Sequence, residues 1–306
     1  MEQTRDFSVE KGNHSMPQVI KSIEAVRNVV RDRKRENQVV GFVPTMGALH
    51  TGHVRLIEEA RKASGLVVVS IFVNPTQFGP SEDYTRYPRT FETDLEQCEK
   101  AGADVVFFPD VAEIYPQDRP SMTFVEVPRL SEIFEGAIRP GHFRGVATVV
   151  CKLFNIVLPD VAYFGAKDFQ QQLIIRRAVQ DLNFPVEIRT IDTVREPDGL
   201  ALSSRNRYLD TAQRKASGML WQALSAARVA VREGERDANR VRQILTRAIE
   251  SEQRASLDYA EVADVETLES LRVLPSDGRA VALLAVRFGT TRLIDNTLLT
   301  DGPGCV

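Results

Sequence analysis

Residues 39–63 read VVGFVPTMGALHTGHVRLIEEARKA, and this stretch decides the fold. Its first five residues, 39–43, form a short apolar run, which is typical of a strand buried on both faces of a sheet. Leu56, Ile57 and Ala60 then recur at helical spacing and define the inner face of a helix. A buried strand that leads directly into a helix is the repeating unit of an α/β fold with a parallel sheet.

The same alternation of strands and helices extends to about residue 192. Helical periodicity is found at 19–37, 53–64, 91–102, 146–159 and 168–183. Apolar runs that predict further strands occupy 65–75, 103–109, 160–165 and 185–192. Continuous apolar strands alternating with helices predict a Rossmann-like parallel sheet that is covered by helices on both faces.

The pattern changes near residue 195, which predicts a second, smaller α+β domain. Two long helical stretches are followed by three strand-like runs, SLDYAEVADV, RAVALLAVRFG and TRLIDN. The helical stretches are predicted at 211–233 and 237–254. The predicted divisions are a flexible N-terminal tail at 1–16, a Rossmann-like domain at 17–193 and a C-terminal α+β domain at 194–306.

Composition and charge exclude several classes of protein. The chain has 306 residues, 43 % hydrophobic content and a net charge of −3, which does not favour a broad surface for nucleic acid. No apolar run approaches the roughly 18 residues that span a bilayer, and from the polar residues at 1–16 we expect no secretion signal. Cys98, Cys151 and Cys305 are too far apart for a zinc or redox motif, so we expect a reducing, cytoplasmic location.

The turn between the predicted strand and helix at residues 39–63 suits a phosphate ligand. Ligands of open α/β sheets bind where strand ends meet helix N-termini, and those N-termini carry unpaired N–H groups. Gly47 and Gly52 allow the backbone to approach a ligand closely, while His50 and His53 add hydrogen-bond donors. Two alternatives remain open: both imidazoles could be packing residues, or they could bind a metal, although no third protein ligand lies nearby.

Three other loops carry polar residues to comparable places. Asn74 and Gln77 follow one predicted strand, and Lys167 with its neighbours follows another. Because the carboxyl ends of parallel strands share one edge of the sheet, these side chains should converge on the histidine turn. The loop at 202–207, LSSRNR, lies just past the predicted boundary and suits a mobile clamp on phosphates. Its alternative interpretation is an ordinary polar linker.

A specific set of motifs makes the chain resemble the pantothenate synthetase (pantoate–β-alanine ligase) family. PTMGALHTGH, VNPTQFG, YPRT, RPGHFRGVATVV, YFGAKDFQQ and DGLALSSRN occur in the family's order, and the likeness extends from about residue 20 to 300. It implies a Rossmann-like domain that binds nucleotide and pantoate, a small C-terminal lid and a homodimer. It also implies a two-step reaction: ATP and pantoate give pantoyl adenylate with magnesium, and β-alanine then displaces AMP.

The resemblance also implies roles for individual residues. His50, His53, Lys167 and Arg205 would act on the phosphates, with His53 as proton donor. Gln77, Gln171 and Asn74 would hold the small substrates, with Gln77 also at the β-alanine site. Asp94 and Gln97 are candidates for the surroundings of the magnesium ion, and an amphipathic surface helix explains them equally well. The implied ATP site comprises Met46, Gly47, Ala48, Leu49, His50, Thr51, Gly52, His53, Gly165, Ala166, Lys167, Asp168, Val194, Leu202, Ser203, Ser204 and Arg205.

Three positions depart from the family pattern. Leu202 replaces a methionine of similar volume, which a pocket should tolerate. Ala166 and Thr51 stand where glutamate is usual, so negative charge near the phosphates is lost, which bears on magnesium affinity. Two other functions stay open: a related nucleotidyltransferase, which would lack the amides of Gln77 and Gln171, and a nucleotide-binding protein without catalysis. The intact cationic and imidazole residues argue against the latter.

Overall fold

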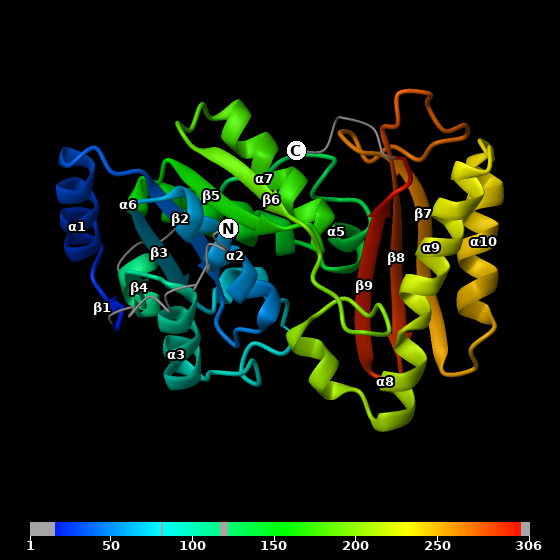
Figure 1. The fold of residues 1–306 in the computed structure, drawn as a ribbon, viewed down its shortest axis with the longest axis horizontal. Coiled ribbons are helices and arrows are strands. Elements are labelled where there is room, and N and C mark those ends of the chain that lie inside the picture. Colours follow the sequence, from blue (N-terminus) through cyan, green and yellow to red (C-terminus); the bar gives the residue numbers. More distant parts are fainter. Residues whose placement is uncertain (1–15, 81, 117–121, 301–306) are drawn as a thin grey trace, which may run out of the picture.

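The computed structural model describes residues 16–80, 82–116 and 122–300 (Figure 1). The predicted tail at 1–16 lies outside this part except for Met16, and Cys305 also lies outside it. None of the described helices is both long enough and apolar enough to cross a membrane.

Six parallel strands form the larger sheet, in the order β1-β4-β3-β2-β5-β6. Every neighbouring pair is parallel. The strands are β1 (Gln18–Ile20), β2 (Val40–Thr45), β3 (Leu66–Ile71), β4 (Val105–Phe107), β5 (Val161–Gly165) and β6 (Glu187–Ile191). The predicted α/β class is therefore confirmed. The prediction missed β1, which occupies residues expected to begin the first helix.

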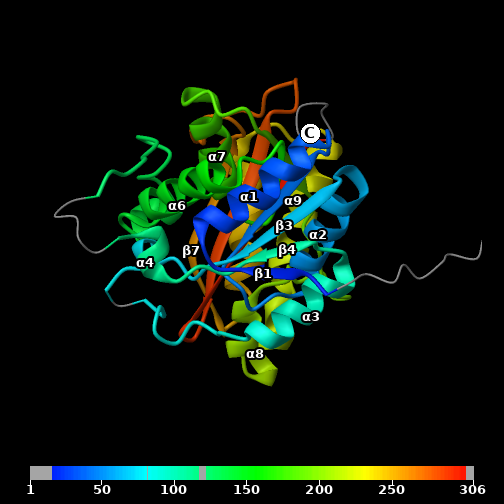
Figure 2. The same ribbon diagram turned by 90° about the vertical axis from the view of Figure 1, so that its left-hand side faces the viewer.

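Helices cover both faces of this sheet. The longer ones are α1 (Ile23–Arg35), α2 (Thr51–Ala63), α3 (Phe91–Ala101), α6 (His142–Val157) and α7 (Phe169–Asp181). Shorter segments are the 3₁₀ helix η1 (Pro75–Gln77), α4 (Val111–Ile114) and α5 (Glu135–Ile138). Successive side chains of β2 point to opposite faces of the sheet. Phe42 packs with α1 and α6 on one face, and Val43 packs with α2 and α3 on the other. Figure 2 shows these helices on the two sides of the sheet. Leu56, Ile57 and Ala60 are buried, as the periodicity predicts.

The order of the central strands creates a crevice at one point of the sheet. Chain order runs outward from β2 to β3 and β4 on one side, and from β5 to β6 on the other. In open α/β sheets, ligands bind where the strand order reverses, outside the carboxyl ends of the two strands. Here those strands are β2 and β5. The loops that follow them carry the two predicted groups of phosphate ligands.

The C-terminal part is a three-stranded antiparallel sheet with two long helices on one face (Figure 1). Its elements are η2 (Ser204–Tyr208), α8 (Thr211–Ser217), α9 (Met219–Arg232), α10 (Ala238–Glu250), β7 (Ala255–Asp264), β8 (Ala280–Phe288) and β9 (Thr291–Leu298). The prediction of three strands is confirmed. The helix predicted at 211–233 is instead two helices that meet at Gly218, where an added Cβ would lie 3.1 Å from Asp198.

The second face of the small sheet packs against helices α6 and α7 of the large-sheet domain. Val281 and Leu283 of β8 share a buried core with Leu173 and Ile174 of α7 and Phe143 of α6. We propose that the boundary between the two domains lies between residues 193 and 194.

The segment that connects the two parts is held by Arg195. Its guanidinium pairs with both oxygens of Asp295 on β9, at 2.6 and 3.0 Å. The same guanidinium lies over the ring of Trp221 on α9, 3.8 Å from the ring centroid. Gly199 faces that ring so closely that an added Cβ would lie 2.0 Å from it. Any larger residue at this turn would displace the tryptophan.

Candidate active site

The loop after β2 ends in two histidines at the N-terminus of α2. His50 is the N-cap, and its Nδ1 accepts a hydrogen bond from the Gly52 N–H at 3.1 Å. His53 Nδ1 accepts from the His50 N–H at 3.4 Å, and the two rings lie 4.1 Å apart. Because Nδ1 accepts in both rings, the neutral imidazoles carry their protons on Nε2. Each histidine is therefore a neutral hydrogen-bond donor at the helix N-terminus.

Burial and nearby cations keep both histidines neutral. Burial, reinforced by the charge of Lys167, lowers the pKa of His50 to about 4. Burial and the adjacent His50 lower the pKa of His53 to about 3. At neutral pH neither ring carries a proton that it could transfer as imidazolium. The neutral His53 ring can donate a hydrogen bond through Nε2, and its role as proton donor stays a prediction.

Asp94 of α3 holds the backbone of the histidine loop. Its carboxylate accepts hydrogen bonds from the Ala48 N–H at 2.9 Å and the Leu49 N–H at 2.8 Å, and Asp94 is 1 % exposed. Gln97 donates to the Leu49 carbonyl at 3.3 Å. Gly47 and Ala48 both have positive φ, of 79° and 50°, so the loop needs this support. In this structure both side chains anchor the loop, and their role near magnesium stays a prediction.

The turn between β5 and α7 presents a lysine and an acid. Lys167 Nζ lies 3.6 Å from Asp168. Burial disfavours the charged form of Asp168, but the charges of Lys167 and Arg205 outweigh it and lower the pKa of that carboxyl. Beside the turn, an added Cβ on Gly165 would meet no atom within 4 Å, so the space there is open.

Asn74 and Gln77 lie together after β3, and both are buried. Asn74 is 1 % exposed and is occupied by protein partners: its Nδ2 donates to Gln77 Oε1 at 2.9 Å, and its Oδ1 accepts from the Tyr115 hydroxyl at 2.9 Å. Gln77 Nε2 in turn contacts Met46 Sδ at 3.1 Å. Asn74 therefore orients Gln77 in this structure and does not itself face the cleft.

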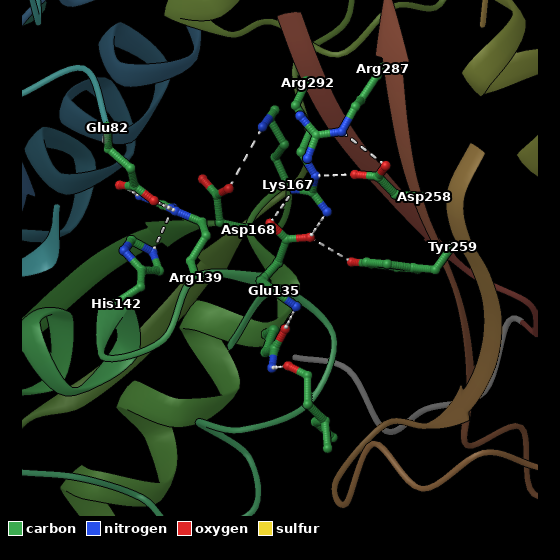
Figure 3. Close-up of polar contacts among 12 residues, drawn as sticks. Glu82, Glu135, Arg139, His142, Lys167, Asp168, Asp258, Tyr259, Arg287 and Arg292 are labelled. Atoms are coloured by element: carbon green, nitrogen blue, oxygen red, sulfur yellow. Dashed lines mark hydrogen bonds and ion pairs between the residues drawn. The ribbon is translucent and has the colours of Figure 1, made fainter. Parts of the chain in front are cut away.

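A second polar chain reaches Gln77 from α6, and sequence reasoning assigned it no role. Arg139 forms two 2.7 Å hydrogen bonds with Glu82 and donates to His142 Nε2 at 3.0 Å (Figure 3). Since arginine can only donate, His142 carries its proton on Nδ1 and donates it to the Gln77 carbonyl at 2.8 Å. Burial, together with Arg139, lowers the pKa of His142 to about 4. The RPGH motif contained these residues, but nothing local in it indicated their partners.

The main cleft has a volume of about 700 Å³ and lies between the small sheet and the helices and loops of the large-sheet domain. Five residues expected at the site line it: Lys167, Asp168, Gln171, Ser203 and Arg205. Cationic residues that were not predicted also line it: Arg86, Arg139, Arg287 and Arg292. His50, His53 and Gln77 are not in this lining. The two histidines lie close enough to Lys167 and Asp168 for those charges to act on their pKa values.

The remaining expected residues of the ATP site lie on the loops around this cleft. Val194 and Leu202 face each other in the connecting segment, where the Leu202 N–H donates to the Val194 carbonyl at 3.0 Å. Ser203 caps η2 by accepting from the Arg205 N–H at 3.3 Å, and Ser204 begins that helix. Thr51 is the exposed first residue of α2.

An ion-pair network closes the far side of the cleft. Arg292 of β9 holds Glu135 with two hydrogen bonds of 2.5 and 2.7 Å, and its Nε donates to Asp258 at 2.6 Å (Figure 3). The Tyr259 hydroxyl donates to the same Glu135 at 2.9 Å. Arg287 joins the network by donating to Asp258 at 3.0 Å. These contacts link α5 to the small sheet across the interface.

Comparisons with known proteins agree on one family. The family model for pantoate-beta-alanine ligase matches residues 18–298. The pantothenate synthetase of Desulfitobacterium hafniense is 50 % identical over 281 residues, covering 92 % of this chain and 98 % of that protein. The protein of the same name from Chloroflexus aurantiacus is 54 % identical over 275 residues, covering 90 % of this chain and 96 % of its own.

Solved structures show the same relationship. Pantothenate synthetase from Thermus thermophilus superposes with a TM-score of 0.85 at 44 % identity, covering 92 % of this chain and 99 % of that one. Pantoate-beta-alanine ligase from Francisella tularensis, complexed with beta-gamma ATP and beta-alanine, gives a TM-score of 0.74 at 32 % identity. This second match covers 94 % of this chain and 100 % of that one.

Proposed function

The chain belongs to the pantoate–β-alanine ligase family, and we propose that its cleft joins pantoate to β-alanine with ATP, through a pantoyl-adenylate intermediate. The observation that carries the proposal is the meeting of two strand-end turns at the reversal of strand order. One turn brings two neutral N–H donors, His50 and His53, and the other brings the cation Lys167. The complex of the Francisella tularensis ligase with beta-gamma ATP and beta-alanine supports these as ligands here.

In the first step, a carboxylate oxygen of pantoate attacks the α-phosphorus of ATP. A new P–O bond forms, the bond to the bridging oxygen breaks, and pyrophosphate leaves. Negative charge develops on the phosphate oxygens, so hydrogen-bond donors and cations aimed there lower the barrier. We assign this role to His53, His50, Lys167 and Arg205. No protein nucleophile takes part in this scheme.

Neutral amides are suited to holding pantoate, which offers hydroxyl groups and a carboxylate. Gln171 lines the main cleft, and Gln77 is fixed at its side chain by Asn74 and at its carbonyl by His142. We propose that these two glutamines orient pantoate for attack. This fixed geometry is what converts two bound molecules into a reacting pair.

In the second step, the amine of β-alanine attacks the acyl carbon of the adenylate. A C–N bond forms, the bond from the acyl carbon to the phosphate oxygen breaks, AMP leaves, and the amine nitrogen loses its proton. Gln77 lies on the side of the adenylate opposite the nucleotide in this scheme. We propose that it also contacts β-alanine.

The described residues do not form a protein cage for magnesium. Asp94 and Gln97 are committed to the loop at Ala48 and Leu49, and no cluster of three or more His, Cys, Asp or Glu side chains in the described ranges could hold an ion. Magnesium typically binds through substrate phosphates and few carboxylates. We therefore propose that the ion enters with ATP, and we derive no step from a protein-bound metal.

We also propose a homodimer in the cytoplasm, on the family resemblance. The exposed side chains of Met122 and Phe124 provide apolar surface that an interface could cover. Sedimentation of the purified protein would check the dimer, because a monomer at micromolar concentration is incompatible with it.

Isotope exchange between pyrophosphate and ATP tests the proposed reaction. Exchange should require pantoate and should not require β-alanine, because the adenylate forms first. AMP release should then require both substrates. Exchange that depends on β-alanine, or a phosphorylated enzyme, would rule out the adenylate route.

A further inference from the structure

Asn296 reaches from the small sheet to the turn that carries Lys167. It lies on β9, is 7 % exposed, and its Nδ2 donates to two backbone carbonyls of the turn between β5 and α7. The distances are 3.0 Å to the Ala166 oxygen and 2.7 Å to the Lys167 oxygen. Both hydrogens of the side-chain amide are thus used on one turn, more than 120 positions away in the chain.

Asn296 is itself held firmly from behind. Its backbone N–H donates to Asp295 Oδ1 at 2.8 Å. The Asp295 side chain is 1 % exposed, and its carboxylate accepts hydrogen bonds from both terminal nitrogens of Arg195. Because Arg195 also lies over Trp221, the anchor extends into α9. These contacts hold Asn296 in one position relative to the turn between β5 and α7.

On the side of the large sheet, the Ala166 N–H donates to the Ile191 carbonyl at 2.9 Å. Asp168 stands at the N-cap of α7, but its side chain makes no capping hydrogen bond. The direction of the Lys167 side chain follows from the backbone of residues 166–168, which Asn296 holds by its carbonyls. A displacement of about 1 Å in a catalytic group can reduce a rate about 10²-fold.

We propose that Asn296 is a positioning residue for adenylation, which acts by fixing the turn that aims Lys167 at the phosphates. The inference rests on the proposed function, since it assigns that reaction to the cleft. It assigns a residue of the small sheet to the positioning of the turn between β5 and α7, which belongs to the large-sheet domain. Asparagine suits the task because aspartate lacks the two hydrogens, and glutamine is one carbon longer.

Two substitutions and a control test the proposal. Asn296→Ala removes both hydrogen bonds, and Asn296→Asp keeps the shape but places an acceptor opposite two acceptors. Pantoate-dependent exchange should fall about 10- to 100-fold in kcat for both variants, with the KM for ATP changed less than threefold. Thr297→Val, at the next position of β9, should keep the wild-type rate and thermal unfolding midpoint.

A double-mutant cycle separates positioning from a general structural role. If Asn296 acts through Lys167, adding Asn296→Ala to Lys167→Ala should reduce the remaining rate by less than about threefold. Rate losses that multiply would overturn the inference, and so would a wild-type rate in either Asn296 variant. A wild-type enzyme without pantoate-dependent exchange would instead overturn the proposed function.

Discussion

The hydrogen bond at Nδ1 determines which nitrogen of His50 and His53 carries the proton and faces a ligand. In each ring, Nδ1 accepts a backbone N–H at the start of α2, so the neutral ring presents an N–H through Nε2. Such donors stabilise phosphate oxygens without the transfer of a proton. They also require no counter-charge in the free enzyme.

Replacing His53 should separate hydrogen bonding from charge. His53→Ala should fold normally and lower the kcat of adenylation about 10²- to 10³-fold, the usual effect of losing one transition-state donor. His53→Gln should recover part of this loss, because a glutamine amide also donates. Single-turnover adenylation measures both. A near-wild-type rate in His53→Ala would show that the residue does not contact the reacting phosphate.

The pH dependence of the same variants should show whether the imidazole titrates. Burial holds the pKa of His53 near 3, so the ring is neutral throughout the range from pH 6 to 8. The profile of kcat against pH for His53→Gln should therefore have the wild-type shape in this range, at a lower rate. If kcat of the wild-type enzyme changes with pH in this range and kcat of His53→Gln does not, imidazolium is the active form.

At the scale of elements, α3 determines the shape of the histidine loop. The backbone N–H groups of Ala48 and Leu49 both donate hydrogen bonds to the carboxylate of Asp94 on α3. Burial raises the pKa of Asp94 above its ordinary value, while these hydrogen bonds favour its charged form. The helix thus holds the loop through these hydrogen bonds, one of which falls at Ala48, where φ is 50°.

Asp94→Asn distinguishes a loop anchor from a metal ligand. The amide of asparagine would turn a donor toward a backbone donor, at a loss of about 1–3 kcal/mol for a buried unsatisfied group. We expect a higher KM for ATP and a lower kcat at every magnesium concentration. Recovery of the wild-type rate at high magnesium would instead support the metal role. Glu96→Gln, on the exposed face of the same helix, serves as control.

The 3₁₀ helix η2 brings Arg205 to the cleft on a short, capped loop. Arg205 lines the cleft, and the Ser203 side chain caps the N-terminus of the helix. If the loop closes over ATP during reaction, Arg205→Ala should lower kcat far more than it raises the Kd for ATP. Arg205→Lys should restore part of the rate, since a point charge cannot reproduce the guanidinium fork.

Equilibrium binding of ATP alongside single-turnover adenylation measures the two effects. Arg207→Ala provides the matched comparison, because Arg207 belongs to the same helix, is exposed and does not line the cleft. Its rate should change less. A loss of ATP affinity in Arg205→Ala as large as its loss of rate would make the loop a static part of the site.

At the scale of the whole molecule, buried histidines set the response to acid. Burial lowers the pKa of His50, His53 and His142 from 6.5 to about 4, 3 and 4. Between those values and 6.5, the unfolded chain binds more protons than the folded one, so stability rises with pH in this window. It is fully present above about pH 6.5 and is lost as the pH falls.

The loss should reach about 1.4 kcal/mol per pH unit for each histidine within its window. Urea unfolding at pH 7, 6 and 5 would measure it. His142→Gln should reduce the slope, because it removes one of the three groups. Stability that stays constant from pH 7 to 5 would contradict the burial of neutral imidazoles.

The sequence predicted the sheet domain and the small antiparallel sheet because both follow from local hydrophobic periodicity. It could not predict the contacts of Asp94, His142 and Asn296, which join residues 45 to 130 positions apart. No pattern at short range distinguishes a carboxylate that anchors a loop from one on a solvated helix. The break at Gly218 was missed because the apolar period continues through it.

Trp221, on which Arg195 stacks, is an intrinsic fluorescent probe of the protein. This tryptophan is the single one in the chain, and it touches the segment that leads from the large sheet toward Arg205. A guanidinium 3.8 Å from the indole and a glycine turn pressed against its edge both influence how the excited ring emits light. Fluorescence excited at the indole band therefore comes from one known place. Its intensity and colour would follow the connecting segment in real time as nucleotide binds, without any added dye.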